Sequence, residues 1–148
     1  VSFAMAPVPP AACARYCAAQ GVDKADADLY SELFDGHIGT VLAAAKDEAR
    51  RQQVEKALAL AKAAAAKDSY AAAVLLAPYE KEKAGAAALL ADLRAVAAAG
   101  LRESPRAPVR GEGAGRLIAA ADAAIQRLQA QVNPKITLTV FASRFRAL

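Results

Sequence analysis

The chain has 148 residues and a formal net charge of +4, and 56% of its residues are apolar. This length is enough for one domain or two small ones, and it can bury a core without metal ions or disulfides. No uninterrupted apolar run reaches the roughly 20 residues that cross a bilayer, and the N-terminus lacks the basic flank of a signal peptide. These features predict a cytoplasmic protein with no membrane partner. Because the sequence starts at Val1 without a methionine, we expect an excised piece of a longer polypeptide.

Basic residues are concentrated in the last third of the chain. Residues 101–148 contain eight Lys or Arg and three Asp or Glu, whereas residues 1–100 contain 11 and 12. Such a skew is compatible with a nucleic-acid surface. The sequence contains no Trp and shows no glycine-rich recognition loop. We therefore favour solvated helix faces and acidic protein partners over direct contact with DNA.

The first predicted helix covers about Pro9 to Gln20. Prolines suit the first helical turn, and Gly21 provides a stop. We expect Tyr16 and Cys17 to lie on the inner side of this helix.

A second helix is predicted over residues 23–34. Asp23 is a good N-cap, and Asp26 in the first turn complements the helix dipole. An apolar stripe completes the pattern, and its members are Leu29, Tyr30, Leu33 and Phe34.

A third predicted helix starts near His37 and continues as one long helix to Ala65, with Asp47 and Arg51 as an i,i+4 ion pair. A helix of this length is suited to connecting two domains. We therefore predict a three-helix unit over residues 1–46 and a second helical domain over residues 47–148.

The second domain contains three further helical patterns. Asp68 caps a helix that Pro78 must kink or break. A pattern of period 3.6 then runs to Gly100. After a polar loop that we expect to be mobile, over residues 102–115, the strongest amphipathic stripe follows. This stripe consists of Leu117, Ile118, Ala121, Ile125, Leu128 and Val132.

The sequence offers few candidates for catalytic or metal-binding residues. Cys13 and Cys17 lie one helical turn apart, which is compatible with a zinc site that includes His37, but two small buried thiols are the more common outcome of this spacing. His37 has no nucleophile or acid partner at a recognisable spacing to make it a general base. The glycine-rich segment Gly111–Gly115 lacks both a preceding strand and a following Lys-Ser or Lys-Thr, so a linker is favoured over a phosphate loop. We predict no catalytic, metal or cofactor site.

The nine residues Phe34–Leu42 carry a family resemblance. The spacing Gly36-x-x-Gly39 resembles the "sensor 2" turn of AAA+ clamp-loader subunits, which is usually Gly-x-x-Arg and whose arginine reaches the ATP phosphates. Gly39 stands in the arginine's place. The resemblance therefore implies the non-hydrolysing, delta-prime type of subunit, with no nucleotide cofactor.

A second resemblance lies near the C-terminus. The segment Gln131–Leu138 is similar to the closing Asn-x-Asn-Pro-x-Leu-x-Leu-Glu segment of clamp-loader subunits, with departures at Gln131 and Thr139. Asn133 is suited to capping a helix, and Pro134 to its first position. In that family the last helix belongs to a collar domain through which five subunits form a ring.

Together these resemblances imply an all-α fold, with a small AAA+ lid over residues 1–46 and a helical-bundle collar over residues 47–148. The implied partners are the gamma/tau and delta subunits, and indirectly the sliding clamp and primer-template DNA. The chain would then be a scaffold in the DNA-directed DNA polymerase III assembly with no active site of its own. The partner-binding residues that we predict are Leu138, Phe141, Arg144 and Phe145.

Two alternatives stay open. A gamma/tau-like ATPase subunit would need an arginine where Gly39 stands. A free-standing helical adaptor would bind a partner helix through the stripe from Leu117 to Val132.

Overall fold

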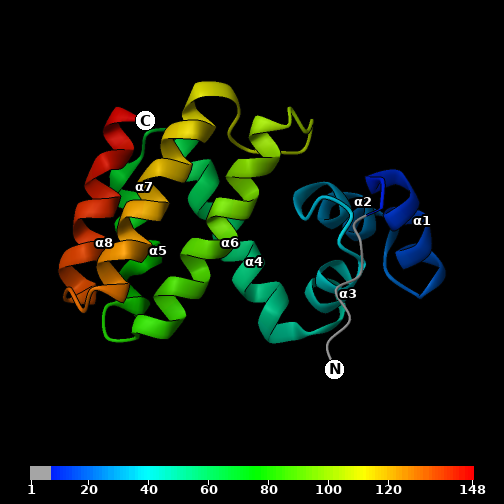
Figure 1. The fold of residues 1–148 in the computed structure, drawn as a ribbon, viewed down its shortest axis with the longest axis horizontal. Coiled ribbons are helices and arrows are strands. Elements are labelled where there is room, and N and C mark those ends of the chain that lie inside the picture. Colours follow the sequence, from blue (N-terminus) through cyan, green and yellow to red (C-terminus); the bar gives the residue numbers. More distant parts are fainter. Residues whose placement is uncertain (1–7) are drawn as a thin grey trace. The chain divides into compact units, whose positions relative to one another are not determined.

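The computed structural model describes residues 8–148, and within this range the chain forms eight α-helices, two short 3-10 helices and no strands (Figure 1). The all-α prediction is confirmed. The helices are α1 (Pro10–Ala19), α2 (Lys24–Leu33), α3 (Ile38–Lys46), α4 (Glu48–Ala65), α5 (Ser69–Leu76), α6 (Lys83–Leu101), α7 (Gly111–Gln129) and α8 (Pro134–Ser143), and the 3-10 helices are η1 (Ala77–Tyr79) and η2 (Arg144–Ala147).

The chain divides into two compact units, Val1–Gln52 and Gln53–Leu148. The division falls inside α4, later than the predicted boundary after Lys46. Two contacts explain the shift. The Arg51 guanidinium lies 3.1 Å from the Asp26 carboxylate, and the Arg50 guanidinium stands 5.9 Å from the centre of the Phe34 ring. The first turns of α4 are therefore tied to α2 by charge and by a cation–π contact.

The first unit contains α1, α2 and α3 packed on one another. Its core includes Cys13, Cys17, Tyr30, Leu33 and Val41. The prediction that Tyr16 faces inward is wrong, because this ring is 48% exposed. Since Cys13 and Cys17 are one turn apart and both buried, they define the inner face of α1, and Tyr16 is rotated about 100° away from Cys17.

A break at Asp47 separates α3 from α4, so the prediction of one continuous helix is wrong. Asp47 has an extended backbone (φ −92°, ψ 115°). Its carboxylate accepts hydrogen bonds from the backbone N–H groups of Ala49 at 3.0 Å and Arg50 at 3.4 Å. Asp47 therefore serves as the N-cap of a new helix. No Gly or Pro lies near Asp47 to mark the end of a helix, and this concealed the break in the sequence.

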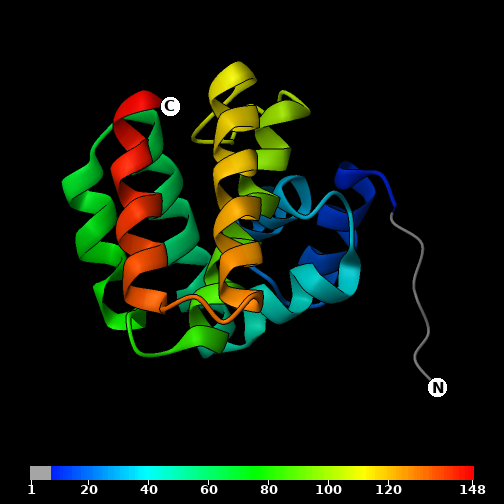
Figure 2. The same cartoon turned by 60° about the vertical axis from the view of Figure 1, so that its left-hand side comes forward.

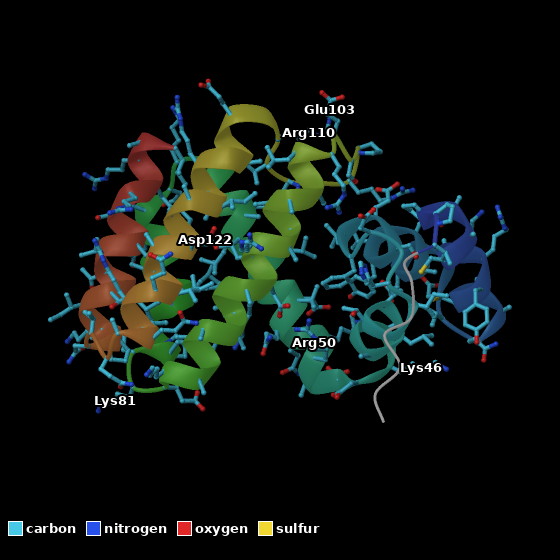
Figure 3. All side chains as sticks on the ribbon, viewed as in Figure 1. Lys46, Arg50, Lys81, Glu103, Arg110 and Asp122 are labelled. Carbon is cyan, nitrogen blue, oxygen red and sulfur yellow. The ribbon has the colours of Figure 1, made fainter. Side chains whose placement is uncertain are left out.

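In the second unit, α6 and α7 form an antiparallel pair (Figure 1). The apolar pattern predicted for α6 is confirmed, since Leu89, Leu90, Leu93, Val96 and Ala97 are all buried. Asp122, labelled on α7 in Figure 3, lies 2.7 Å from the Arg94 guanidinium of α6. Alanines between the larger side chains of α7 allow the two helices to approach closely.

The prediction of a mobile polar loop ending at Gly115 is wrong, because α7 begins at Gly111. The connection covers only residues 102–110, and within it Ala107 and Val109 are buried. A Cβ at Gly100 would overlap the carbonyl oxygen of Val109. The absence of a side chain at Gly100 therefore allows the end of α6 to pack against this connection.

The last layer of the second unit is formed by α5 and α8, which lie side by side (Figures 1 and 2). As predicted, α5 ends before Pro78, and Asn133 caps α8 by accepting from the N–H groups of Lys135 and Ile136. The Arg146 Nε donates to the Ser69 hydroxyl at 3.0 Å. The end of α8 thus meets the start of α5, and the two helices run antiparallel.

By length and composition, α6 is apolar enough to cross a membrane. The count of uninterrupted apolar runs in the sequence did not show this, because Asp92 and Arg94 interrupt the run. Half of the apolar window is buried inside the structure, as in the core helix of a helical bundle. Asp92 itself is buried and accepts a hydrogen bond from Gln53 Nε2 of α4.

Candidate partner-binding surface

The turn that resembles sensor 2 is built from two residues with positive φ. Helix α2 ends at Leu33, Asp35 and Gly36 follow with φ of 51° and 75°, and α3 begins at Ile38. His37 stabilises this turn because its Nδ1 donates to the carbonyl oxygen of Phe34 at 2.7 Å. The predicted join of two helices within a few residues of Gly36 is confirmed.

Gly36 is required for a second reason. The backbone N–H of Val8 donates to the Gly36 carbonyl at 3.2 Å. A Cβ at Gly36 would overlap the carbonyl oxygen of Val8. Glycine at this position therefore serves both the left-handed turn and the close approach of a preceding segment.

Gly39, in the position of the family's arginine, lies in the first turn of α3. It is exposed, and nothing lies within 4 Å of the point that a Cβ would occupy. Contact with a neighbouring residue is therefore not the reason for glycine at this position.

The two cysteines form a buried, free thiol pair on α1. Burial and the neighbouring Cys13 raise the pKa of Cys17 to about 11, against an opposing effect of Lys46. Lys46 Nζ donates to the Gln20 carbonyl at 3.0 Å. Over residues 8–148, no three His, Cys, Asp or Glu side chains are grouped so as to hold a metal ion. His37 is held at the turn by Phe34.

The four predicted partner-binding residues divide into two sets. Leu138, Phe141 and Phe145 are buried in the core of the second unit, where the two phenylalanine rings meet edge to face at 5.2 Å. Only Arg144 is exposed. The buried residues support the shape of the α8 surface, and their contact with a partner stays a prediction.

The stripe on α7 that the adaptor alternative needs is largely used inside the unit. Leu117, Ala121 and Leu128 are fully buried, and only Val132 at its end is clearly exposed. This stripe is therefore not available as a docking face.

The sequence analysis missed a different apolar surface. Of the large apolar side chains exposed within residues 8–148, three lie on α5 and α8: Tyr70 is 79% exposed, Val74 54% and Ile136 59%. A shallow open groove of about 300 Å³ runs between the two helices. Its lining consists of Ser69, Tyr70, Ala73, Thr139, Ala142, Ser143 and Arg146. The absence of charged residues from Ser69 to Tyr79 was the signal that could have revealed this surface.

The α8 side of this groove belongs to a basic segment, whereas the exposed Asp68 directly precedes Ser69 at the start of α5. Between Asp122 and Leu148 the sequence has no Asp or Glu and four basic residues, namely Arg127, Lys135, Arg144 and Arg146. Arg146 lines the groove itself, held at one end by its bond to Ser69. Arg127 and Arg144 line a separate hollow between α7 and α8, so Arg146 is the basic residue in the lining of the α5–α8 groove.

Comparison with protein-family models, with curated proteins and with solved structures found no match to this chain.

Proposed function

We propose that this chain is the lid and collar portion of a clamp-loader subunit of the delta-prime type. It acts as a scaffold, without hydrolysing ATP, in the ATP-driven loading of a sliding clamp during DNA replication. Its partners are the gamma/tau and delta subunits, contacted through the collar.

The observation that carries the proposal is the turn at Gly36. A small three-helix unit places this left-handed glycine between its second and third helices, and Gly39 follows in the first turn of α3. This is the arrangement that the sensor 2 resemblance implies. Gly39 is exposed, and nothing lies within 4 Å of the point that a Cβ would occupy, so packing does not explain why this position lacks an arginine. This favours a loss of nucleotide contact over a structural requirement, and it disfavours the gamma/tau alternative.

The second unit supports the collar assignment. Its last helix starts with the Asn133 cap and Pro134, as the second resemblance implies. The exposed apolar face on α5 and α8 is typical of a protein that assembles with others. An enzyme with its own active site is disfavoured, since His37 makes a structural hydrogen bond and Cys13 and Cys17 are buried.

The test is co-purification of the chain with tagged gamma/tau and delta subunits from the same source. We expect retention of the chain through a gel-filtration step in stoichiometric amount. A helical protein of similar size serves as the control for non-specific capture. Passage of the chain without retention by either subunit would contradict the proposal.

A further inference from the structure

We propose that the α5–α8 face, defined by Tyr70, Val74, Ile136, Thr139, Ser143 and Arg146, is the docking surface for an amphipathic helix that carries carboxylates beside its apolar stripe. The inference rests on the proposed function in one respect, which is that the partner helix belongs to a neighbouring loader subunit.

The first argument is the pattern of exposed residues on α5. A solvated helix normally presents charged side chains to water. On α4 this holds, because its exposed positions include Glu55, Lys56 and Lys62. On α5 the exposed positions are Tyr70, Ala73 and Val74, with no charge among them. The outer side of α5 therefore has the composition of a contact surface.

The second argument is continuity across two helices. Because α5 and α8 run antiparallel, Val74 near the end of α5 is placed toward the start of α8, where Ile136 lies. Single exposed apolar residues are ordinary, whereas contiguous ones mark interaction sites. The open groove between the helices gives a partner helix a seat for its apolar side chains.

The third argument is the state of the polar groups along α8. The Thr139 hydroxyl donates to the Lys135 carbonyl at 2.7 Å, and the Ser143 hydroxyl donates to the Val140 carbonyl at 2.7 Å. Both donors are used within their own helix. Apolar atoms can therefore cover these hydroxyls without leaving a donor unsatisfied.

The basic side chains on the α5–α8 face indicate that the partner helix carries acidic side chains. Arg146 stands at one end of the groove, and the exposed Lys135 lies one helical turn before Thr139 of the groove lining, toward the other end. The acid nearest to the groove in the sequence, Asp68, accepts a hydrogen bond from the Ala71 N–H at the start of α5. Carboxylates flanking the apolar stripe of a partner would meet these cations, which accelerates association and fixes the orientation of the helix.

The experiment measures binding of the whole chain to purified gamma/tau and delta subunits by calorimetry. We expect Tyr70→Glu and Val74→Glu each to weaken binding at least tenfold, because a carboxylate is placed in the apolar seat. Tyr16→Glu, a change at an accessible tyrosine of the first unit, should leave the affinity unchanged. Arg146→Glu should weaken binding and reduce its salt dependence, whereas Arg116→Glu on exposed α7 should do neither.

Thermal unfolding of each variant shows whether the fold is kept, and a labelling measurement adds a second readout. Since Cys13 and Cys17 are buried, a thiol introduced by Tyr70→Cys should be the fast site for a maleimide. Bound partner should slow this labelling at least tenfold.

The outcomes separate the two proposals. If the chain binds the loader subunits and the Tyr70 and Val74 variants bind equally well, the docking inference is overturned and the proposed function stands. If the chain binds neither subunit, both fall. If sedimentation shows that the chain alone dimerises and Tyr70→Glu abolishes the dimer, the face joins two copies and the acidic-helix inference is overturned.

Discussion

At the residue scale, three glycines near the first unit's turns have different physical roles. Gly36 combines a φ of 75° with contact to Val8, Gly21 has a φ of 91° in open space, and Gly39 is a helical residue in open space. Only the structure distinguishes them, because their conformations and neighbours depend on the packed unit.

Substitution of each glycine by alanine should change the stability of the chain by a different amount. Gly36→Ala is expected to lower the free energy of unfolding by at least about 2 kcal/mol, since left-handed strain adds to overlap with the Val8 carbonyl. Gly39→Ala should raise it by about 0.5–1 kcal/mol, because alanine is the better helix former. Urea unfolding measures both, with Gly21→Ala as the intermediate control at a cost of about 1–2 kcal/mol. Equal values for the first two variants would show that the turn is not formed as described.

The Cys17 thiol leads to a prediction about pH. Its pKa is raised to about 11 from an ordinary value of 9.0, so the folded state holds this proton more tightly than the unfolded state. Its contribution to stability is therefore present below about pH 9 and is lost as the pH rises toward 11. Between pH 8 and pH 10.5, the wild-type chain should lose more stability in denaturant unfolding than Cys17→Ala does. Parallel pH profiles for the two proteins would contradict this.

At the element scale, Asp47 decides where one helix ends and another begins. Removing its carboxylate by Asp47→Ala should cost about 1 kcal/mol of stability, because two N–H groups in the first turn of α4 lose their acceptor. Asp47→Ser keeps a capping oxygen and should cost only a few tenths of a kcal/mol. Thermal unfolding compares the pair, and a Ser variant as unstable as the Ala variant would rule out capping as the cause.

The packing of α7 gives a second prediction at this scale. Leu128→Ala should destabilise the chain by about 2–5 kcal/mol, since it leaves a cavity in the second unit. Val132→Ala, at the exposed end of the same stripe, should cost less than about 1 kcal/mol. Guanidinium unfolding tests whether the stripe is core along its length or only in its middle. Similar losses at the two positions would show that the end of the stripe is also buried.

Most element boundaries followed from local signals. The caps at Asp23, Asp68 and Asn133 and the break before Pro78 were predicted because each acts on the few residues beside it. The break at Asp47 was missed, since no Gly or Pro near it marks the end of a helix. The start of α7 was missed because its glycines suggested a linker, while the position of Gly115 against Leu101 at the end of α6 depends on the tertiary structure.

At the scale of the whole molecule, the proposed function predicts that the chain has no nucleotide site. Titration with ATP in a calorimeter should show no binding tighter than about 1 mM. Gly39→Arg should leave this result unchanged, because one cation near an exposed turn does not make a phosphate site. Measurable affinity in the unmodified chain would contradict the assignment to a non-hydrolysing subunit.

By itself the sequence determined the helical class, most of the helices and the turn at Gly36, because helix propensity, capping and glycine conformation act over a few neighbouring residues. It also determined that the segment after Asp122 is basic. Tertiary structure alone decided that Leu138, Phe141 and Phe145 lie inside the second unit while Tyr70, Val74 and Ile136 lie outside it. Each of these helices has an apolar side, and which side is covered depends on the helices that pack against it, far away in the sequence.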